Sequence, residues 1–533
     1  MLALTEANRK WWVLLGTSAG LFLLMLDSTV VALALPSVQA DLDASNDQLQ
    51  WVLNAYLLVV AALVVTAGRL GDIFGRKRVF VAGFGVFGAG SLIAAVAWNA
   101  DVLIAGRIVM AAGAASMLPL SLALVTSVFP VDEQPRAIGI WTAVSAIALG
   151  IGPLIGGVLS DIDWRLIFVV NVPIVIGAVL LVRAAAPEVR DETSERSIDW
   201  PGLALLTFGL GASVFALVSS DDWGWTSART LILLAAGLAS LVGFWFVEHR
   251  VSNPIVEFPL FRNRPYLGAT VAAFGVVATY WTLMFFEPQY LQNILDYSAV
   301  EAGLLILPLT VPMVVVSPFS SRLISKFGAR ATMTLGMTLS VVGLVILTQI
   351  SGTTGYGVLF PGLLAVGLAL ALVYAPMSTA AMAAMPKAKA GIAASVLAMN
   401  RVMAGAIGLA VVSAVFQSLL RSELGNELGR RGFHLDGHQR EQLDGLLAGS
   451  QKAQDAVAND PRGLAGEIRE IATDAFSFAL GNALWILVGV AAVCTVLTWW
   501  LVESKAAAEA GDELDAAPAP PHRRHHHFGG FHI

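Results

Sequence analysis

The stretch GRLGDIFGRK, residues 68–77, recurs far along the chain as SRLISKFGAR, residues 321–330. The two align without gaps and share an arginine, a leucine, a phenylalanine and a glycine at matching positions. Each follows the second apolar segment in a block of six. A repeat of this kind predicts two parallel six-helix bundles, related by an axis along the membrane normal, that rock about a site near the bilayer midplane.

The composition indicates a membrane protein. Of the 533 residues, 57% are hydrophobic and 13% are charged, whereas soluble domains average about 45–50% and about 25%. The net charge of −6 carries little information, because lipid would cover most of the surface. The single cysteine, Cys494, rules out a disulfide within the chain and a zinc site with cysteine spacing.

Fourteen apolar segments are long enough to cross a hydrocarbon core of about 30 Å as helices. The first follows Arg9 and Lys10, but it is longer than the apolar core of a signal peptide, so we expect it to be retained. The segments are residues 12–35, 50–70, 79–98, 101–124, 138–159, 166–185, 200–218, 230–248, 267–288, 300–320, 331–350, 356–380, 391–419 and 475–502.

The basic residues of the connecting loops alternate along the chain, as the positive-inside rule requires. The loop after the second segment carries Arg76, Lys77 and Arg78, whereas the loop after the first has only acidic charges. Arg165 is a mild exception, and the outer segment 420–474 carries seven basic residues. A loop of that length approaches the size at which charge bias loses its effect. The pattern predicts a multi-pass protein of the cell (inner or plasma) membrane with both termini in the cytoplasm.

These segments define an all-α polytopic membrane protein with four regions. Residues 12–185 are expected to form an N-terminal six-helix bundle, 200–248 two inserted central helices, and 267–502 a C-terminal six-helix bundle. Within the last, residues 420–474 are expected to form a partly helical outer loop. Residues 503–533 are expected to be a disordered cytoplasmic tail, which is preferred over a metal role for its histidines.

Four motifs follow one another along the chain: LDSTVVALALP at 26–36, GRLGDIFGRKR at 68–78, GIGPLIGG at 150–157 and WRLIFVVNVP at 164–173. With these motifs the sequence resembles the major facilitator superfamily, and within it the fourteen-helix drug:proton antiporters of QacA/EmrB type. The resemblance covers residues 12–502.

Two departures from that branch concern the substrate rather than the mechanism. Ala32 stands where the branch often has asparagine, so one polar lining group is missing. In the fourth segment, Met110 and Ala111 replace the usual Gln-Gly, although Arg107 is retained.

The resemblance implies that the motif after the second segment is a gate element. Asp72 is expected to cap or pair with a neighbouring helix when the cytoplasmic side closes, with Arg76 joining it. The glycines of the motif would allow a tight turn and close backbone approach. In the alternative interpretation the basic residues only set topology. The gate residues are Gly68, Arg69, Gly71, Asp72, Gly75, Arg76 and Lys77.

The glycine- and proline-rich motif of the fifth segment predicts a close helix contact. Small residues let membrane helices pack closely, and a proline frees a backbone carbonyl. Close packing alone would explain the motif, but the resemblance implies in addition that the contact blocks leak and favours export. The residues are Gly150, Gly152, Pro153, Gly156 and Gly157.

Asp27 is a lone carboxylate among side chains that suit lipid, in LLMLDSTVVALALP at residues 23–36. A charge at the centre of a spanning helix costs about 2.5–3.5 kcal/mol on insertion scales, and intramembrane ionisable residues are functional as a rule. Asp27 is therefore predicted to load and release a proton. Because protonation changes its charge, it would also admit or exclude a cation by turns. The alternative is a structural acid paired with a neighbouring helix.

Arg107 is the expected partner of Asp27. At 1.5 Å per residue, Asp27 lies about 13 Å and Arg107 about 9 Å from the outer ends of their helices, so the two should meet in the outer half. The resemblance implies that this arginine tunes the acid for proton transfer. The alternative is an arginine whose charged group reaches the outer interface.

Glu287, just before Pro288, is the further acid of interest. It could attract a cationic substrate, act as a second proton site, or lie at the interface in water. Trp51, Asn54, Tyr56 and Trp281 are candidates for lining a cavity, although packing and aromatic belts explain most such residues. Glu301 and Arg401 are expected to be structural or interfacial.

The sequence predicts a transporter and no enzyme. It contains no Walker A pattern, hydrolase triad or metal motif, so neither ATP nor a cofactor is expected. The leading hypothesis is a monomeric, proton-driven exporter of hydrophobic or cationic amphiphiles, without nucleic-acid partners. A dedicated self-resistance exporter of one natural product remains an alternative. A nutrient importer and a membrane scaffold are less favoured, because of the helix-five motif and the predicted pair of intramembrane charges.

Overall fold

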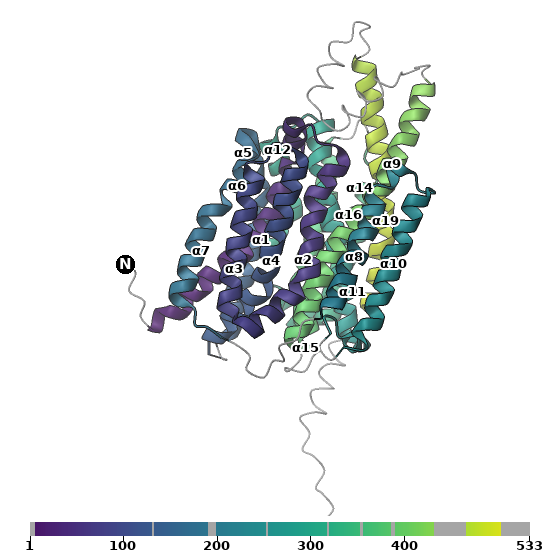
Figure 1. The fold of residues 1–533 in the computed structure, drawn as a ribbon. Coiled ribbons are helices and arrows are strands. Elements are labelled where there is room, and N and C mark those ends of the chain that lie inside the picture. Colours follow the sequence, from purple (N-terminus) through teal and green to yellow (C-terminus); the bar gives the residue numbers. More distant parts are fainter. Residues whose placement is uncertain are drawn as a thin grey trace, which may run out of the picture.

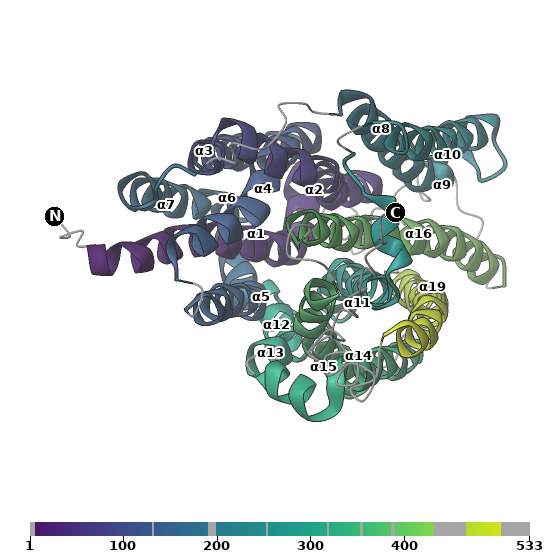
Figure 2. The same ribbon diagram turned by 90° about the horizontal axis from the view of Figure 1, so that it is seen from below.

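A computed structural model of the chain describes residues 6–130, 133–189, 199–251, 254–316, 319–351, 355–384, 390–430 and 465–502. These residues form helices without strands, arranged as two groups of long helices with a helical hairpin beside them (Figures 1 and 2). The tail and most of the outer loop predicted for 420–474 lie outside the described residues.

The first group of helices, which we call the N half, surrounds α1 and α4. Helix α1 contacts α4, α5 and α7, while α4 packs against α2 and α3. The helices are α1 (Glu6–Leu42), α2 (Asn46–Phe74), α3 (Arg76–Ala95), α4 (Ala100–Val128), α5 (Gln134–Asp163), α6 (Leu166–Val169) and α7 (Asn171–Ala185).

The second group, the C half, surrounds α11. This helix contacts α14, α15, α16 and α19. The elements are η1 (Phe258–Arg262), α11 (Arg264–Gln289), the π-helical turn η2 (Tyr290–Ile294), α12 (Ala299–Leu305), α13 (Leu307–Val316), α14 (Ser320–Leu347), α15 (Tyr356–Ala383), α16 (Ala390–Arg430) and α19 (Ala465–Leu501).

The inserted hairpin consists of α8 (Trp200–Val218), α9 (Ser220–Trp223) and α10 (Ala228–Glu248). Helix α8 contacts both α2 of the N half and α16 of the C half. The hairpin therefore lies at one side of the seam between the halves, as Figure 2 shows.

In the part of the chain that the structure describes, each of the fourteen segments predicted to span the membrane lies mostly in helix. Within the described residues, twelve helices are long and apolar enough to cross a membrane, and the pair α12 and α13, bent by 46°, would make a thirteenth. Helix α5 is not among them, so the count of fourteen is not confirmed. The bend follows from Pro308, which has no N–H to donate to the carbonyl of Leu304.

The internal repeat is present in the backbone. Gly75 and Gly328 occupy the same position in the alignment of the two stretches. Both have positive φ, at 109° and 82°, and each lies where one helical segment turns into the next. Such a conformation strongly favours glycine, because a Cβ atom would clash with the backbone. The same backbone turn is therefore used in both halves.

The halves meet at the end of the bundle that carries the α5–α6 and η2–α12 connections. We call this the outer end, after the orientation predicted from sequence, and it lies at the top of Figure 1. Gln292 Nε2 of η2 donates to Leu33 O of α1 at 3.2 Å, and α12 packs on α5. Helices α16 and α19 extend past the other helices here (Figure 1). The outer end is thus closed by contacts between the halves.

Candidate transport site

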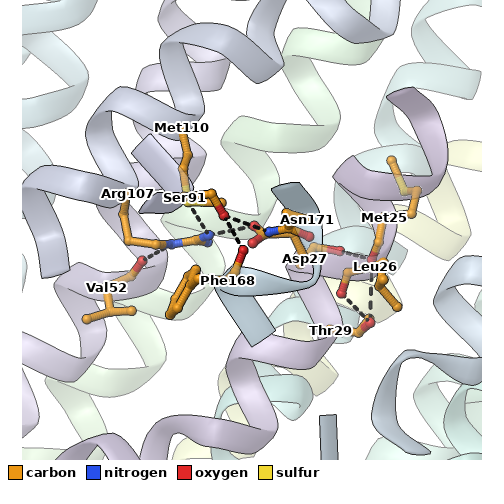
Figure 3. A network of polar contacts seen from close by, with 11 residues as sticks. Met25, Leu26, Asp27, Thr29, Val52, Ser91, Arg107, Met110, Phe168 and Asn171 are labelled. Atoms are coloured by element: carbon orange, nitrogen blue, oxygen red, sulfur yellow. Dashed lines mark hydrogen bonds and ion pairs between the residues drawn. The ribbon is translucent and has the colours of Figure 1, made fainter. Parts of the chain in front are cut away.

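Asp27 and Arg107 form an ion pair inside the N half. Asp27 of α1 is 3% exposed and Arg107 of α4 is 1% exposed. Arg107 Nη1 lies 2.5 Å from Asp27 Oδ2, and Arg107 Nε donates to Val52 O of α2 at 3.1 Å. Figure 3 shows the guanidinium held between α1 and α2. The structure brings together the two residues expected to meet, whereas their role in proton coupling remains a prediction.

Further side chains surround the pair, among them Met110, whose Sδ lies 3.9 Å from Arg107 Nη1. The Arg107 Cζ atom lies 4.2 Å from the centre of the Tyr56 ring, a cation–π contact. Asn171 of α7 lies beside Asp27 (Figure 3) and donates to Ser91 Oγ at 3.0 Å. Ser91 in turn donates to Phe168 O at 2.8 Å. Sequence reasoning missed Asn171, although it stands inside the motif WRLIFVVNVP.

This arrangement is suited to binding one proton reversibly. Burying two charges costs several kcal/mol per ion, which is offset only when they pair and hydrogen-bond well. Arg107 meets that condition through Asp27, Val52 and Tyr56. Adding a proton to Asp27 would neutralise its carboxyl group and break the ion pair, while Arg107 would retain its backbone and ring contacts. The carboxylate therefore has two distinct states with different charge.

The turn of the gate motif is held by the end of α7 and by the residues that follow it. Gly75 N–H donates to Gly71 O at 2.9 Å and closes α2. Arg76 N–H donates to Val189 O at 2.9 Å. Lys77 Nζ donates to the carbonyl oxygens of Arg183 and Ala186, both at 2.8 Å.

The remaining residues of the gate motif lie in α2. A Cβ on Gly71 would overlap Leu120 of α4, so this glycine allows close approach of α2 and α4. Gly68 and Arg69 are half-buried in α2. The side chain of Asp72 lies outside the described residues. The gating role of the motif therefore stays a prediction.

The glycine motif of α5 packs on both halves. A Cβ on Gly152 would overlap Thr29 of α1, and one on Gly156 would lie 3.0 Å from Val30 Cα. A Cβ on Gly157 would lie only 2.5 Å from Ala299 O of α12 in the C half. Pro153 O would be equally near a Cβ on Gly303 of α12. Gly150 lies in α5, and its surroundings are outside the described residues.

The candidates for cavity lining lie in different places. Trp51 of α2 is half-buried, with its ring 5.7 Å from that of Phe215 in the inserted hairpin. Asn54 is buried, and neither of its amide atoms has a partner among the described residues. Trp281 of α11 packs over Gly405 of α16. Of this set, Tyr56 has its ring against the guanidinium of the ion pair.

The structure also places the other charged residues, Glu287, Glu301 and Arg401. Glu287 of α11 is 1% exposed, so it lies neither in an open vestibule nor at the interface in this conformation. Glu301 completes a capping box with Ser298 at the start of α12, which is the structural role expected. Arg401 is half-buried, 5.1 Å from the centre of the Tyr374 ring.

A repeated pair of helical bundles in the membrane, closed at one end and holding a buried carboxylate–arginine pair, defines a membrane transporter of small molecules rather than an enzyme. The sequence model of the family described as the Major Facilitator Superfamily matches residues 17–409 of the chain. The chain belongs to this superfamily.

Relatives of known name cover most of the chain. "Multidrug resistance protein Stp" of Mycobacterium tuberculosis (strain CDC 1551 / Oshkosh) is 34% identical over 78% of this chain and 78% of its own. The "Tetracenomycin C resistance and export protein" of Streptomyces glaucescens is 32% identical over 77% of each. A bacterial homologue of the human lysosomal transporter Spinster, solved inward-facing and unoccupied, shares the fold with a TM-score of 0.62 and 15% identity. That match covers 92% of this chain and 98% of the Spinster homologue.

Proposed function

We propose that this protein is a proton-driven exporter of hydrophobic and cationic small molecules, acting as a monomer in the cell membrane with both termini in the cytoplasm. Two relatives are named for multidrug resistance and for tetracenomycin C resistance and export, which supports export of amphiphilic compounds. The predicted loop charges support the orientation.

The observation that carries the proposal is the buried pair of Asp27 and Arg107. In this conformation, with the outer end closed, the pair is formed and Asp27 is ionised. When the outer end opens, a proton entering from outside adds to Asp27 and breaks the pair. Closure of the outer end and release of the proton inside restore it. The carboxylate therefore takes up a proton outside and releases it inside as the halves alternate.

A dedicated exporter of one natural product is the second candidate, because one relative is named for a single compound. A nutrient importer on the same fold is less well supported. The close contact of Gly157 with α12 and the acid in α1 are both features of the predicted antiporter motifs.

The proposal is tested in inverted membrane vesicles with an imposed proton gradient. Asp27→Asn should abolish uphill movement of a fluorescent cationic dye, since the amide cannot take part in proton exchange. The variant protein should still reach the membrane at the level of the parent chain. Uphill dye transport at the parent rate by Asp27→Asn would refute the proton role.

A further inference from the structure

Glu287 is a buried carboxyl group that the exchange at Asp27 does not use. It lies near the end of α11, directly before Pro288 and the π-helical turn η2. Its residue is 1% exposed, and neither carboxyl oxygen has a hydrogen-bond partner among the described residues. This lack of partners distinguishes it from Asp27, which has Arg107.

Among the described residues, no charged side chain acts as a counter-charge to Glu287. Two tyrosines, Tyr290 of η2 and Tyr356 of α15, are near enough to interact with it electrostatically. Their hydroxyls donate elsewhere, to Ser351 O at 3.3 Å and Leu305 O at 2.8 Å. The other elements packed on α11, which are α1, η1, α12, α14, α16 and α19, bring no described charged side chain that acts on it.

An ionised carboxylate in such a place would be far more costly than the neutral acid, because nothing replaces the water it has lost. The carboxyl group of Glu287 therefore carries a proton while the outer end is closed. In the same conformation the guanidinium of Arg107 favours the ionised form of Asp27, with which it pairs. The surroundings of the two acids therefore favour opposite protonation states.

The position of Glu287 indicates the side from which its proton comes. Five residues further on, Gln292 Nε2 makes the 3.2 Å bond to Leu33 O that joins the halves at the outer end. A small cavity between the halves is lined by Gln50 of α2, by Gln289 and by several phenylalanines. The π-helical geometry of η2 is of a kind that often occurs at functional sites. Separation of Gln292 from Leu33 would bring water to this end of α11.

We propose that Glu287 is a second proton-binding site, filled from the outer face, and that the outer end closes only when the site is occupied. The inference rests on the alternating access proposed above. On closing, a proton from the outer water adds to one carboxyl oxygen, and on reopening it returns to the same water. This proton is not carried across the membrane, so it sets the equilibrium of closure and leaves the number of protons exchanged at Asp27 unchanged.

The test measures the opening of the outer end directly, in full-length protein in detergent. Spin labels on Trp98→Cys and Gly355→Cys, one in each half and both exposed, report the distance across the outer end, on a Cys494→Ala background. All proteins also carry Asp27→Asn, so that titration of Asp27 contributes nothing. With Glu287 present, the closed population should fall as pH rises. With Glu287→Gln it should stay high at every pH, whereas Glu301→Gln should behave like the protein with Glu287.

A second measurement detects the proton on Glu287 itself and does not depend on spin-labelled variants. Infrared spectra of the parent chain should contain the carbonyl band of a protonated carboxyl group. Glu287→Gln should lose this band, and Asp27→Asn and Glu301→Gln should retain it. The same pH dependence of closure with and without Glu287, or a band unaffected by Glu287→Gln, would overturn the inference. Neither result depends on whether Asp27 drives export.

Discussion

At the scale of single residues, the contribution of Asp27 and Arg107 to stability can be measured separately from their contribution to transport. Removing one partner leaves a buried charge uncompensated, which costs about 3–5 kcal/mol, whereas replacing both by apolar residues is often neutral. Asp27→Leu and Arg107→Met should therefore each lower the stability of the protein by about that amount. The double variant should recover most of the loss. Unfolding in detergent micelles by heat measures all three against the parent.

The double variant also serves as the control for function. It should be folded and inactive in proton-driven dye transport, because no titratable group is left at the site. If instead it were as unstable as the two single variants added together, the ion pair would not be the interaction that each single change removes. Active transport by the double variant would show that another group carries the proton.

At the scale of helices, the two matched turns make a testable pair. Gly75 has φ 109° and Gly328 has φ 82°, conformations that cost other residues about 1–3 kcal/mol. Gly75→Ala and Gly328→Ala should each destabilise the protein by about that amount. Gly85, a helical glycine of α3 where an added Cβ would meet no atom within 4 Å, is the matched control. Gly85→Ala should be neutral or slightly stabilising, because alanine favours helix. Equal losses of stability at all three glycines in thermal unfolding would show that the two turns do not share a conformation that requires glycine.

The helices also show how much of the fold could be read from sequence. Apolar length placed all fourteen predicted segments on helices, because hydropathy and span length are linked by bilayer thickness. The helices that are long and apolar enough to span number twelve among the described residues, or thirteen with the bent pair, and α5 is not one of them. Apolar length did not locate the polar ends of the helices. Helix α16 runs to Arg430 and α19 starts at Ala465, well beyond the predicted spans 391–419 and 475–502. Polar residues there carry the helix out of the apolar layer, and hydropathy has no signal for that. Proline explains the breaks after Val169 and Leu305.

The sequence predicted how deep in the membrane the candidate site lies, but only some of the residues that form it. Counting residues along α1 and α4 placed Asp27 and Arg107 at similar depths, and the structure pairs them. Depth does not say which way a helix face is turned. The contact of Tyr56 with the guanidinium and the position of Asn171 beside Asp27 follow from helix rotation, which hydropathy and residue counts do not reveal. For the same reason, the burial of Glu287 could not be told from exposure at the interface.

Two glycines of α5 each allow a close helix contact, one between the halves and one within the N half. Gly157 faces α12 across the seam between the halves, whereas Gly152 faces Thr29 within the N half. Overpacking costs about 1–3 kcal/mol, or about a five- to 150-fold change in an equilibrium. Gly157→Ala should shift the halves toward opening of the outer end by that factor and raise proton leak. Gly152→Ala should lower stability without raising leak.

Proton leak is measured by the decay of an imposed pH gradient in proteoliposomes without substrate. The comparison of the two glycines is needed because a general loss of packing would affect both. Matching leak rates in Gly157→Ala and Gly152→Ala would mean that the α5–α12 contact does not seal the outer end.

At the scale of the whole molecule, the direction of export depends on which end of the bundle faces the outside. The loop charges predict that the end carrying Trp98 is outside and the end carrying Arg78 is inside, and the parallel repeats place Ser351 of the C half with Trp98. All three positions are exposed. On a Cys494→Ala background, Trp98→Cys and Ser351→Cys should react with an impermeant maleimide in intact cells, and Arg78→Cys only after the membrane is permeabilised. Reaction of Arg78→Cys in intact cells would reverse the orientation and turn the proposed exporter into an importer. Reaction of Trp98→Cys without Ser351→Cys would place the two halves in opposite orientations, and the shared turn at Gly75 and Gly328 would then have no common origin in a parallel repeat.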